Sequence, residues 1–391
     1  MRIVKVILIF FVLLISCQSP KDKAKDEEKF SWNAGISAPK YYPAAPSVEF
    51  SYQGKGVAGA STGAGDGWGT TSGGFTGGDV FKPVPDSVFV SWKCGVDHFL
   101  YKGGFKLPRK KILALFNKGI KDPYTGRHEE YSTIVAGTAP GGNVTIWMKS
   151  GSKITEIAKF KAENKGIYNE GSKEQQKIMD EIYKSREFIN SETNVFRYFH
   201  GVPYKIWETG EKEYSYDIGF SSEDDLIKPE ITTFYAKDGS WYQAGGTSNF
   251  ESIDWNIFKY KENNNLVKKQ KLPIQIFAEW EKDSVYYSTN IILPQEFEKI
   301  FVKSYALNDT KQYFDRIVIG VKRGGSYGMI WIEGKGKRKS IMNFKVFKAK
   351  MNEMGTYIGG GYSLPKGFVF PKWEKGKEPL NTPDVDYWQE Q

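Results

Sequence analysis

Two patterns in one glycine-rich stretch have the spacing of cofactor-binding or catalytic motifs. Gly54, Gly56 and Gly59 match a dinucleotide-binding fingerprint, and Ser61 between Gly59 and Gly63 matches a hydrolase nucleophile elbow. Both chemistries need a helix that begins directly after the glycines, either to hold a pyrophosphate or to project the serine. More glycines follow instead, and each costs a helix about 1 kcal/mol relative to alanine. We therefore expect neither a nucleotide site nor a nucleophilic serine.

The other residue types that could do chemistry are few and are not grouped. The histidines are His98, His128 and His200, and none is spaced with cysteines or carboxylates as metal ligands usually are. Cys94 lies in the strand-like stretch SVFVSWKCG, where we expect a buried, inert thiol. No pair of carboxylates stands out as a general acid and base. The sequence predicts no metal ion, no cofactor and no catalytic residue.

The glycine-rich segment as a whole, residues 54–78, is the candidate binding site. It holds 11 glycines in 25 positions. A loop of this length without secondary structure is usually functional or disordered, and glycine permits close approach of the backbone to a ligand. A structural or mobile connection is the alternative. The binding residues that we predict are Asp66, Trp68, Phe75 and Asp79.

The amino terminus predicts export and attachment to a lipid. Arg2 and Lys5 precede an apolar run over residues 6–15, as in a secretory signal. This run is far shorter than the roughly 20 residues that a membrane-spanning helix needs. The sequence LISC, which ends at Cys17, resembles the bacterial lipobox, in which the cysteine becomes the acylated first residue of the mature protein. We expect diacylglycerol and a further chain such as palmitate on Cys17; an ordinary secreted protein is the alternative.

Composition and charge narrow the class of partner. Aromatic residues make up 15% of the chain, which favours strands and a substantial core. The net charge of +9 at pH 7 falls by two to +7 when Arg2 and Lys5 are removed with the signal. Outside the cytoplasm, this mild excess argues less for nucleic acid than for anionic lipid head groups or an acidic partner.

Two long parts of the chain resemble each other. The stretch IVAGTAPGGNVTIW from Ile134 recurs as IVIGVKRGGSYGMIW from Ile317, and further matches pair Trp92 with Trp280. We therefore expect a duplicated domain. The predicted organisation is a signal peptide at 1–16, a tether at 17–28, a first repeat domain at 29–167, a linker with a helix at 168–212, a second repeat domain at 213–351 and an irregular C-terminal extension at 352–391.

The pattern of each copy predicts strands, one short helix and further strands. In the first copy, strands are expected at 30–37 and 47–53, followed by a long loop and a hairpin that contains Trp92. Leu-Pro then begins a helix with Ile112, Leu113, Leu115 and Phe116 as its apolar stripe, before two strands that turn at Gly141-Gly142 and a third at 153–160. The residues predicted to be core tryptophans are Trp92, Trp147, Trp280 and Trp331. The fold class is α+β, mainly antiparallel β, with two similar tandem domains.

The linker between the copies carries its own helix signal. Ser172 is followed three residues later by Gln175, which is the pattern of a capping box at the start of a helix. Ile178, Ile182 and Tyr183 would form one face of this connecting helix.

Four motifs together resemble one bacterial lipoprotein family. ISAPKYYP from Ile36, DGWG from Asp66, LPRKKILALFNKG and IVAGTAPGGNVTIW are similar to the family of domain of unknown function 2931. The likeness covers about residues 29–162 and, more weakly, 213–350, where DGWG becomes the sequence DGSW from Asp238. The resemblance implies that the protein is located in the cell envelope and that its domain is duplicated. The family has no established activity.

The function that we expect is that of a non-enzymatic binding or interaction module of the bacterial cell envelope. It would be held to the membrane by the acylated Cys17, on the periplasmic or the cell-surface side, and its ligand would be a protein or an envelope polymer. Two alternatives stay open. One is an immunity-like protein that captures a toxin, with affinity from a buried aromatic cluster. The other is a hydrolase of envelope polymers that uses carboxylates not recognised in the sequence.

Overall fold

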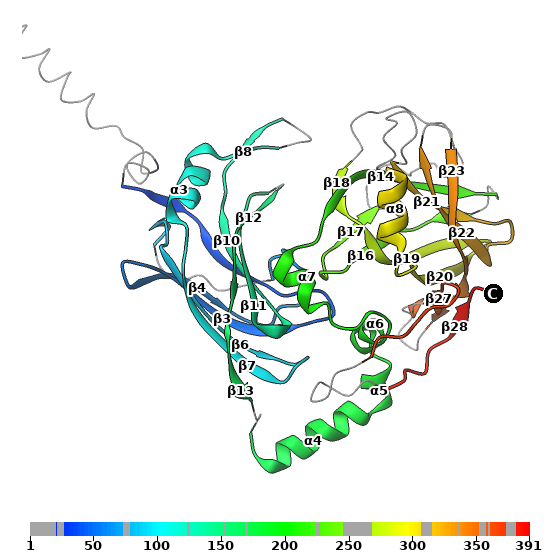
Figure 1. Ribbon diagram of the computed structural model, residues 1–391, viewed down its shortest axis with the longest axis horizontal. Coiled ribbons are helices and arrows are strands. Elements are labelled where there is room, and N and C mark those ends of the chain that lie inside the picture. The colour runs from blue at the N-terminus through cyan, green and yellow to red at the C-terminus, as the bar shows by residue number, and fades with distance from the viewer. Residues whose placement is uncertain are drawn as a thin grey trace, which may run out of the picture. The chain divides into compact units, whose positions relative to one another are not determined.

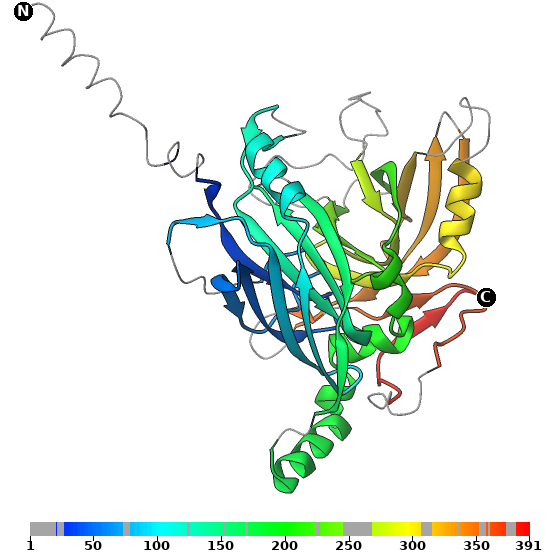
Figure 2. The same cartoon turned by 60° about the vertical axis from the view of Figure 1, so that its left-hand side comes forward.

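The chain is mostly antiparallel β-sheet with a few short helices, and it forms two compact units, residues 1–169 and 170–391 (Figures 1 and 2). The structure is a computed structural model. It describes residues 21, 27–72, 79–122, 126–151, 153–168, 171–223, 227–244, 268–305, 315–334, 337–351, 357–358, 360–372 and 381–391.

The first unit contains a four-stranded sheet. Its order is β12 (Ile154–Lys161), β11 (Asn143–Lys149), β10 (Thr133–Ala139) and β2 (Asn33–Ser37). Neighbours are antiparallel except β2, which runs parallel to β10. The turn between β10 and β11 contains Gly141 and Gly142, both with positive φ, as predicted. A side chain at Gly142 would lie 2.6 Å from the carbonyl oxygen of Ala162, so only glycine fits there.

A five-stranded antiparallel sheet forms the rest of the first unit's framework. Its order is β13 (Glu163–Ile167), β7 (Phe99–Lys106), β6 (Ser87–Cys94), β3 (Ala44–Tyr52) and β4 (Lys55–Ser61). Two short strand pairs accompany it, β1 (Lys29–Ser31) with β5 (Phe81–Pro83) and β8 (Ile120–Lys121) with β9 (His128–Glu129).

Strand β4 corrects the expectation of one long loop from residue 54. Gln53 and Gly54 both have positive φ, and Tyr52 pairs with Lys55, so they form a two-residue hairpin turn. The following residues then pair with β3 and bury Ala58 and Ala60. Glycine and alanine are poor strand formers in isolation, and the neighbouring strand supplies the order that their own propensity lacks.

The short helix and the buried tryptophans that the sequence predicted for the first unit are present in the structure. Helix α3 (Arg109–Lys118) buries Ile112 and Phe116, and Gly119 ends it. Trp92 and Trp147 are buried, and Cys94 is buried as well. Burial raises the pKa of the Cys94 thiol, which therefore stays protonated and unreactive.

The second unit begins with helices. They are α4 (Lys173–Lys184), α5 (Arg186–Ile189), α6 (Glu192–His200) and α7 (Tyr204–Thr209). The capping box that Ser172 and Gln175 predicted is present at the start of α4. Ser185 and Ser191 cap α5 and α6 in the same way, through side chains that accept backbone N–H groups.

Two sheets form the body of the second unit. One has the order β18 (Lys268–Lys271), β14 (Glu213–Ser222), β21 (Arg316–Val321), β22 (Tyr327–Gly334) and β23 (Lys337–Lys345). The other has the order β17 (Trp241–Ala244), β16 (Thr232–Ala236), β19 (Pro273–Lys282), β20 (Val285–Ile292), β27 (Tyr362–Leu364) and β28 (Tyr387–Gln389). The smaller elements are β15 (Lys228–Pro229) on β19, β24 (Phe347–Lys348) on β20, the pair β25 (Lys350–Met351) and β26 (Tyr357–Ile358), and helix α8 (Phe297–Tyr305).

The core of the second unit lies between these sheets. Trp280 is buried within it, and Trp331 is buried as well, so all four tryptophans predicted to be core are buried. The C-terminal extension, expected to be irregular, contributes β27 and β28, which run parallel to their neighbours at the β20 edge. Gly360 makes this possible, since a side chain there would lie 2.0 Å from the carbonyl oxygen of Ser288.

A candidate ligand pocket in the second unit

The predicted binding residues of the first unit that the structure describes differ in their burial. Trp68 is 8% exposed, and its ring meets that of Trp147 edge to face at 4.9 Å. Asp66 is exposed and accepts a hydrogen bond from the Ser72 hydroxyl, while Asp79 is exposed and begins the segment that leads into β5. Phe75 and the predicted lipidation site Cys17 lie outside the described residues. The proposal of a binding site in this segment stays a prediction.

Hydrogen bonds connect the DGWG segment, which begins at Asp66, to strand β2. The Ser37 hydroxyl donates to the carbonyl oxygen of Gly67 and accepts from the backbone N–H of Gly69, each at 3.0 Å. Gly137 leaves room for the two indoles, because a Cβ atom there would lie 2.4 Å from Trp147 and 2.9 Å from Trp68. The contacts of Trp68 are those of a packing residue.

The sequence DGSW, matched to DGWG by sequence, occupies a different place. Asp238 lies in the turn between β16 and β17, whereas Asp66 follows β4. In strand order, the β16–β17 turn corresponds to the Gln53–Gly54 turn between β3 and β4. The structure therefore places these two tetrapeptides after different strands of their units.

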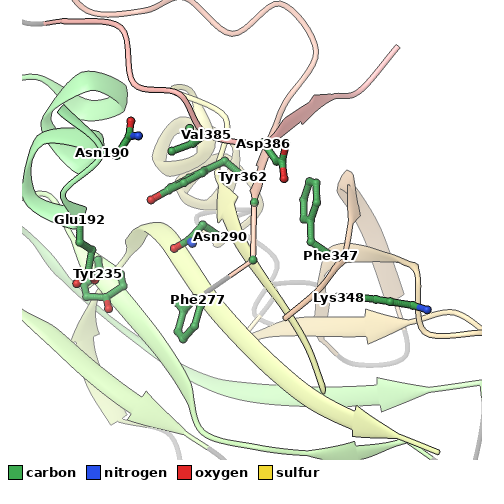
Figure 3. Close-up of a pocket in the computed structure, with 12 residues that line it drawn as sticks. Asn190, Glu192, Tyr235, Phe277, Asn290, Phe347, Lys348, Tyr362, Val385 and Asp386 are labelled. Atoms are coloured by element: carbon green, nitrogen blue, oxygen red, sulfur yellow. The ribbon is translucent and has the colours of Figure 1, made fainter. Parts of the chain in front are cut away.

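A pocket of about 540 Å³ lies in the second unit (Figure 3), within the roughly 300–1,000 Å³ typical of small-molecule sites. None of Asp66, Trp68 and Asp79 lines it. Its lining residues are Asn190, Glu192, Tyr235, Phe277, Asn290, Phe347, Lys348, Gly360, Gly361, Tyr362, Val385 and Asp386.

Three parts of the second unit build this pocket. The junction of α5 and α6 supplies Asn190 and Glu192. Ser191, between these two residues, donates to the Phe188 carbonyl at the end of α5 and accepts the Asn194 N–H at the start of α6. Strands β16, β19 and β20 supply Tyr235, Phe277 and Asn290 from the sheet. The C-terminal extension and β24 complete the lining. In Figure 3, the α5–α6 side chains and those of β24 lie on opposite sides of Asn290.

The aromatic wall on the C-terminal side belongs to a small second core. Tyr362 packs with Val195, Phe199, Ile292 and Leu364. Its ring stacks on that of Phe199 at 4.8 Å. Burial, with the nearby Glu192 and Tyr235, raises the pKa of the Tyr362 phenol, so it stays protonated and can both donate and accept a hydrogen bond.

A relay of hydrogen bonds fixes the side chain of Asn290. His200 is half-buried, and its desolvation lowers its pKa to about 4, which leaves the imidazole neutral at pH 7. Its Nε2 lies 2.7 Å from Gln275 Oε1, so this nitrogen carries the hydrogen and donates it. Gln275 Nε2 then donates to Asn290 Oδ1 at 2.8 Å. With its oxygen engaged in this way, Asn290 keeps its Nδ2 hydrogens for another partner.

Asn190 is held similarly by the chain that follows the pocket. Its Oδ1 accepts the backbone N–H of Asp384 at 2.7 Å, and Arg186 forms an ion pair with the Asp384 carboxylate. This contact ties α5 to the C-terminal extension. It also leaves the Nδ2 group of Asn190 without a protein acceptor among the described residues.

The pocket combines aromatic faces with a small number of polar groups. Glu192 and Asp386 supply two carboxylates and Lys348 one ammonium group. The described residues contain no group of three or more histidine, cysteine or carboxylate side chains placed to hold a metal ion. The arrangement is suited to binding a small polar molecule.

A second cluster of titratable groups lies elsewhere in this unit. Lys271 pairs with the Asp238 carboxylate, and Glu211 accepts the backbone N–H of Asp238 at 2.9 Å. Burial, followed by the nearby Asp238 carboxylate, raises the pKa of Glu211 to about 8. These contacts join the strand β14 entry to the β16–β17 turn, which is a structural role.

Sequence reasoning missed the pocket because its residues come from seven separated segments of the chain. Two signals were present. The glycine run at 359–361 precedes a short apolar stretch, which is typical of close backbone approach, and His200 ends a helix rich in aromatic residues.

Comparison with known proteins found a match to one family model. No helix in the described part of the chain is long and apolar enough to cross a membrane. Neither the curated proteins nor the solved structures gave a match. The model of the family described as "Protein of unknown function (DUF2931)" matches residues 18–205, which include the strands of the first unit and helices α4 to α6.

Proposed function

We propose that the protein is a lipid-anchored binding protein of the bacterial envelope that takes a small polar ligand into the pocket of its second unit. The observation that carries this proposal is the pocket itself, a cavity of about 540 Å³ with aromatic walls and oriented amide groups. Few convergent polar groups among aromatic side chains are the usual make-up of a ligand site. The volume favours a small molecule over a toxin, which would need a broad protein interface.

The anchor rests on the amino-terminal sequence. Charged residues, a short apolar run and the sequence LISC that ends at Cys17 have the order of a lipoprotein signal. Two or more acyl chains would hold the protein stably at a membrane. Mass spectrometry of the mature N-terminal peptide tests the anchor, and an unmodified Cys17 thiol would remove it from the proposal.

A duplication within the chain explains the architecture. Each unit has a sheet in which the first strand runs parallel to a later one, β2 with β10 and β14 with β21. The register shift next to Trp147 in the first unit has its counterpart next to Trp331 in the second. The pocket uses the α5–α6 junction and the C-terminal extension, which precede and follow the paired strands, so it lies where the two copies differ.

Capture from envelope material tests the binding function. The acylated full chain in detergent is incubated with a solubilised bacterial envelope extract, repurified and weighed by native mass spectrometry. We expect a bound species on the wild type and on Val369→Trp, whose residue is 64% exposed. We expect none on Val385→Trp, because the larger ring fills the pocket. A bound species that persists on Val385→Trp would place the ligand elsewhere, and none on any form would refute binding.

A hydrolase of envelope polymers is the second candidate, since two carboxylates, Glu192 and Asp386, line the same pocket. General acid–base catalysis needs such a pair within reach of one bond. The species recovered from the wild type separates the two functions. A binding protein releases its ligand unchanged after long incubation, whereas a hydrolase releases shorter products, and Glu192→Gln would stop their formation.

A further inference from the structure

We infer that the pocket of the second unit recognises an uncharged, hydroxyl-rich ligand, namely a neutral saccharide. This inference names the ligand class of the proposed function and rests on it. It is carried by the groups that the pocket offers, by their charges and by the way in which they are held.

The two asparagine side chains of the pocket offer N–H donors, which require acceptor atoms such as oxygen on the ligand. Asn190 and Asn290 both use their oxygens within the protein, toward the Asp384 backbone and toward Gln275. Their Nδ2 groups have no protein acceptor in the described part of the chain. Both side chains line the same cavity (Figure 3). A ligand with several acceptor oxygens can accept hydrogen bonds from these amide N–H groups.

The charges of the pocket disfavour ionic ligands. Glu192 and Asp386 outnumber Lys348, so an anion that accepted from the amides would meet two carboxylates. An ammonium ion would suit the carboxylates, but it has only donors and would face the amide donors of Asn190 and Asn290. A hydroxyl group both donates and accepts, so a neutral polyol can serve the carboxylates and the amides together.

The aromatic side chains complete this chemistry. Phe277, Phe347 and Tyr362 line the cavity together with the polar groups. One face of a sugar ring is made of C–H groups, which pack on an aromatic ring while the hydroxyls at the edge reach polar side chains. A strongly hydrated, flexible polyol without a ring would gain no such contact.

The relay behind Asn290 makes its amide a preorganised donor. Gln275 is buried and His200 is half-buried, and together they fix which end of Asn290 faces the cavity. Binding then costs little side-chain ordering. Gln275 and His200 act as positioning residues, and Asn290 contacts the ligand.

A glycan array tests the ligand class. The fluorescently labelled full chain in detergent is applied to arrayed neutral, amino and carboxylated glycans, and hits are titrated by calorimetry. We expect hits among the neutral glycans. Asn290→Asp keeps the shape and the bond from Gln275 but turns the donor into an acceptor, so the Kd should rise at least about tenfold. Asn164→Asp, on an exposed strand of the first unit, should leave the Kd unchanged.

The outcomes separate this inference from the proposed function. Hits confined to charged glycans, or an unchanged Kd in Asn290→Asp, overturn the saccharide inference. An empty array with a ligand captured by the wild type but not by Val385→Trp also overturns it, while leaving the binding function in place. An empty array with no captured species refutes both.

Discussion

His200 Nε2 and Gln275 Oε1 lie 2.7 Å apart, and this bond connects helix α6 with the strand beneath the pocket. The imidazole is half-buried, and the ring of Phe196 packs against it at 4.4 Å. A neutral histidine can hold this position, whereas an imidazolium ion would be partly desolvated, and its Nε2 faces the amide of Gln275 rather than a carboxylate. The link between helix and sheet is therefore sensitive to acid.

The first prediction concerns stability at low pH. The folded-state pKa of His200 is lowered to about 4 from the ordinary value of 6.5. The unfolded chain therefore binds the proton first, and stability is lost as the pH falls from about 6.5 toward 4, by at most about 3 kcal/mol. Thermal unfolding between pH 7 and 4 should show a smaller loss in His200→Gln than in the wild type. His128→Gln, at an exposed histidine, should behave as the wild type.

The second prediction concerns Glu211 and has the opposite sign. Burial and Asp238 raise its pKa to about 8, so the folded state favours the protonated carboxyl. Stability from this group is complete below about pH 4.5 and is lost as the pH rises through 8. Glu211→Gln should therefore be more stable than the wild type at pH 9 and show a flatter pH profile in chemical denaturation. Exposed Glu208→Gln in α7 is the control, and equal profiles for all three proteins would contradict the assignment.

The third prediction concerns the glycine that admits the C-terminal extension. A methyl group at Gly360 would lie 2.0 Å from the Ser288 carbonyl oxygen, so Gly360→Ala must displace the chain from β20. We expect a loss of roughly 1–3 kcal/mol in the free energy of unfolding, with loss of ligand capture. Gly63→Ala, where a methyl group meets no atom within 4 Å, should change neither quantity. If Gly360→Ala captured the ligand as well as the wild type does, the C-terminal extension would not form part of the pocket.

The fourth prediction concerns Trp68. Its ring is buried against Trp147, so Trp68→Ala should destabilise the protein by roughly 3–5 kcal/mol, the usual cost of deleting a buried aromatic ring. Trp241→Ala, at a tryptophan that is 37% exposed, should cost much less. Denaturant unfolding followed by fluorescence measures both. A stable Trp68→Ala protein that has lost ligand capture would instead make Trp68 a binding residue.

Local patterns predicted the parts of the fold that depend on neighbours in sequence. The helix at Arg109–Lys118, the glycine turn at Gly141-Gly142 and the capping box at Ser172 each follow from a few adjacent residues. The burial of Trp92 and Trp280 follows from strand alternation around them. These features need no knowledge of the tertiary structure.

The pocket and three strands depend on contacts that sequence reasoning does not reveal. The orientation of the Asn290 amide depends on Gln275 and His200, which lie 15 and 90 positions away along the chain. Strands β27 and β28 have only three residues each and are ordered by the sheet edge that they join. Strand β4 was missed because its glycines weaken a local strand signal.

Hydrogen–deuterium exchange of the full chain, with and without the envelope extract, tests the central claim that the ligand occupies the second unit. The account predicts slower exchange at Glu192, along β20 and at 360–363 when the extract is present, with no change at 62–72. These changes should be absent in Val385→Trp. Protection at 62–72 without protection around the pocket would contradict the account and return the binding site to the glycine-rich segment of the first unit.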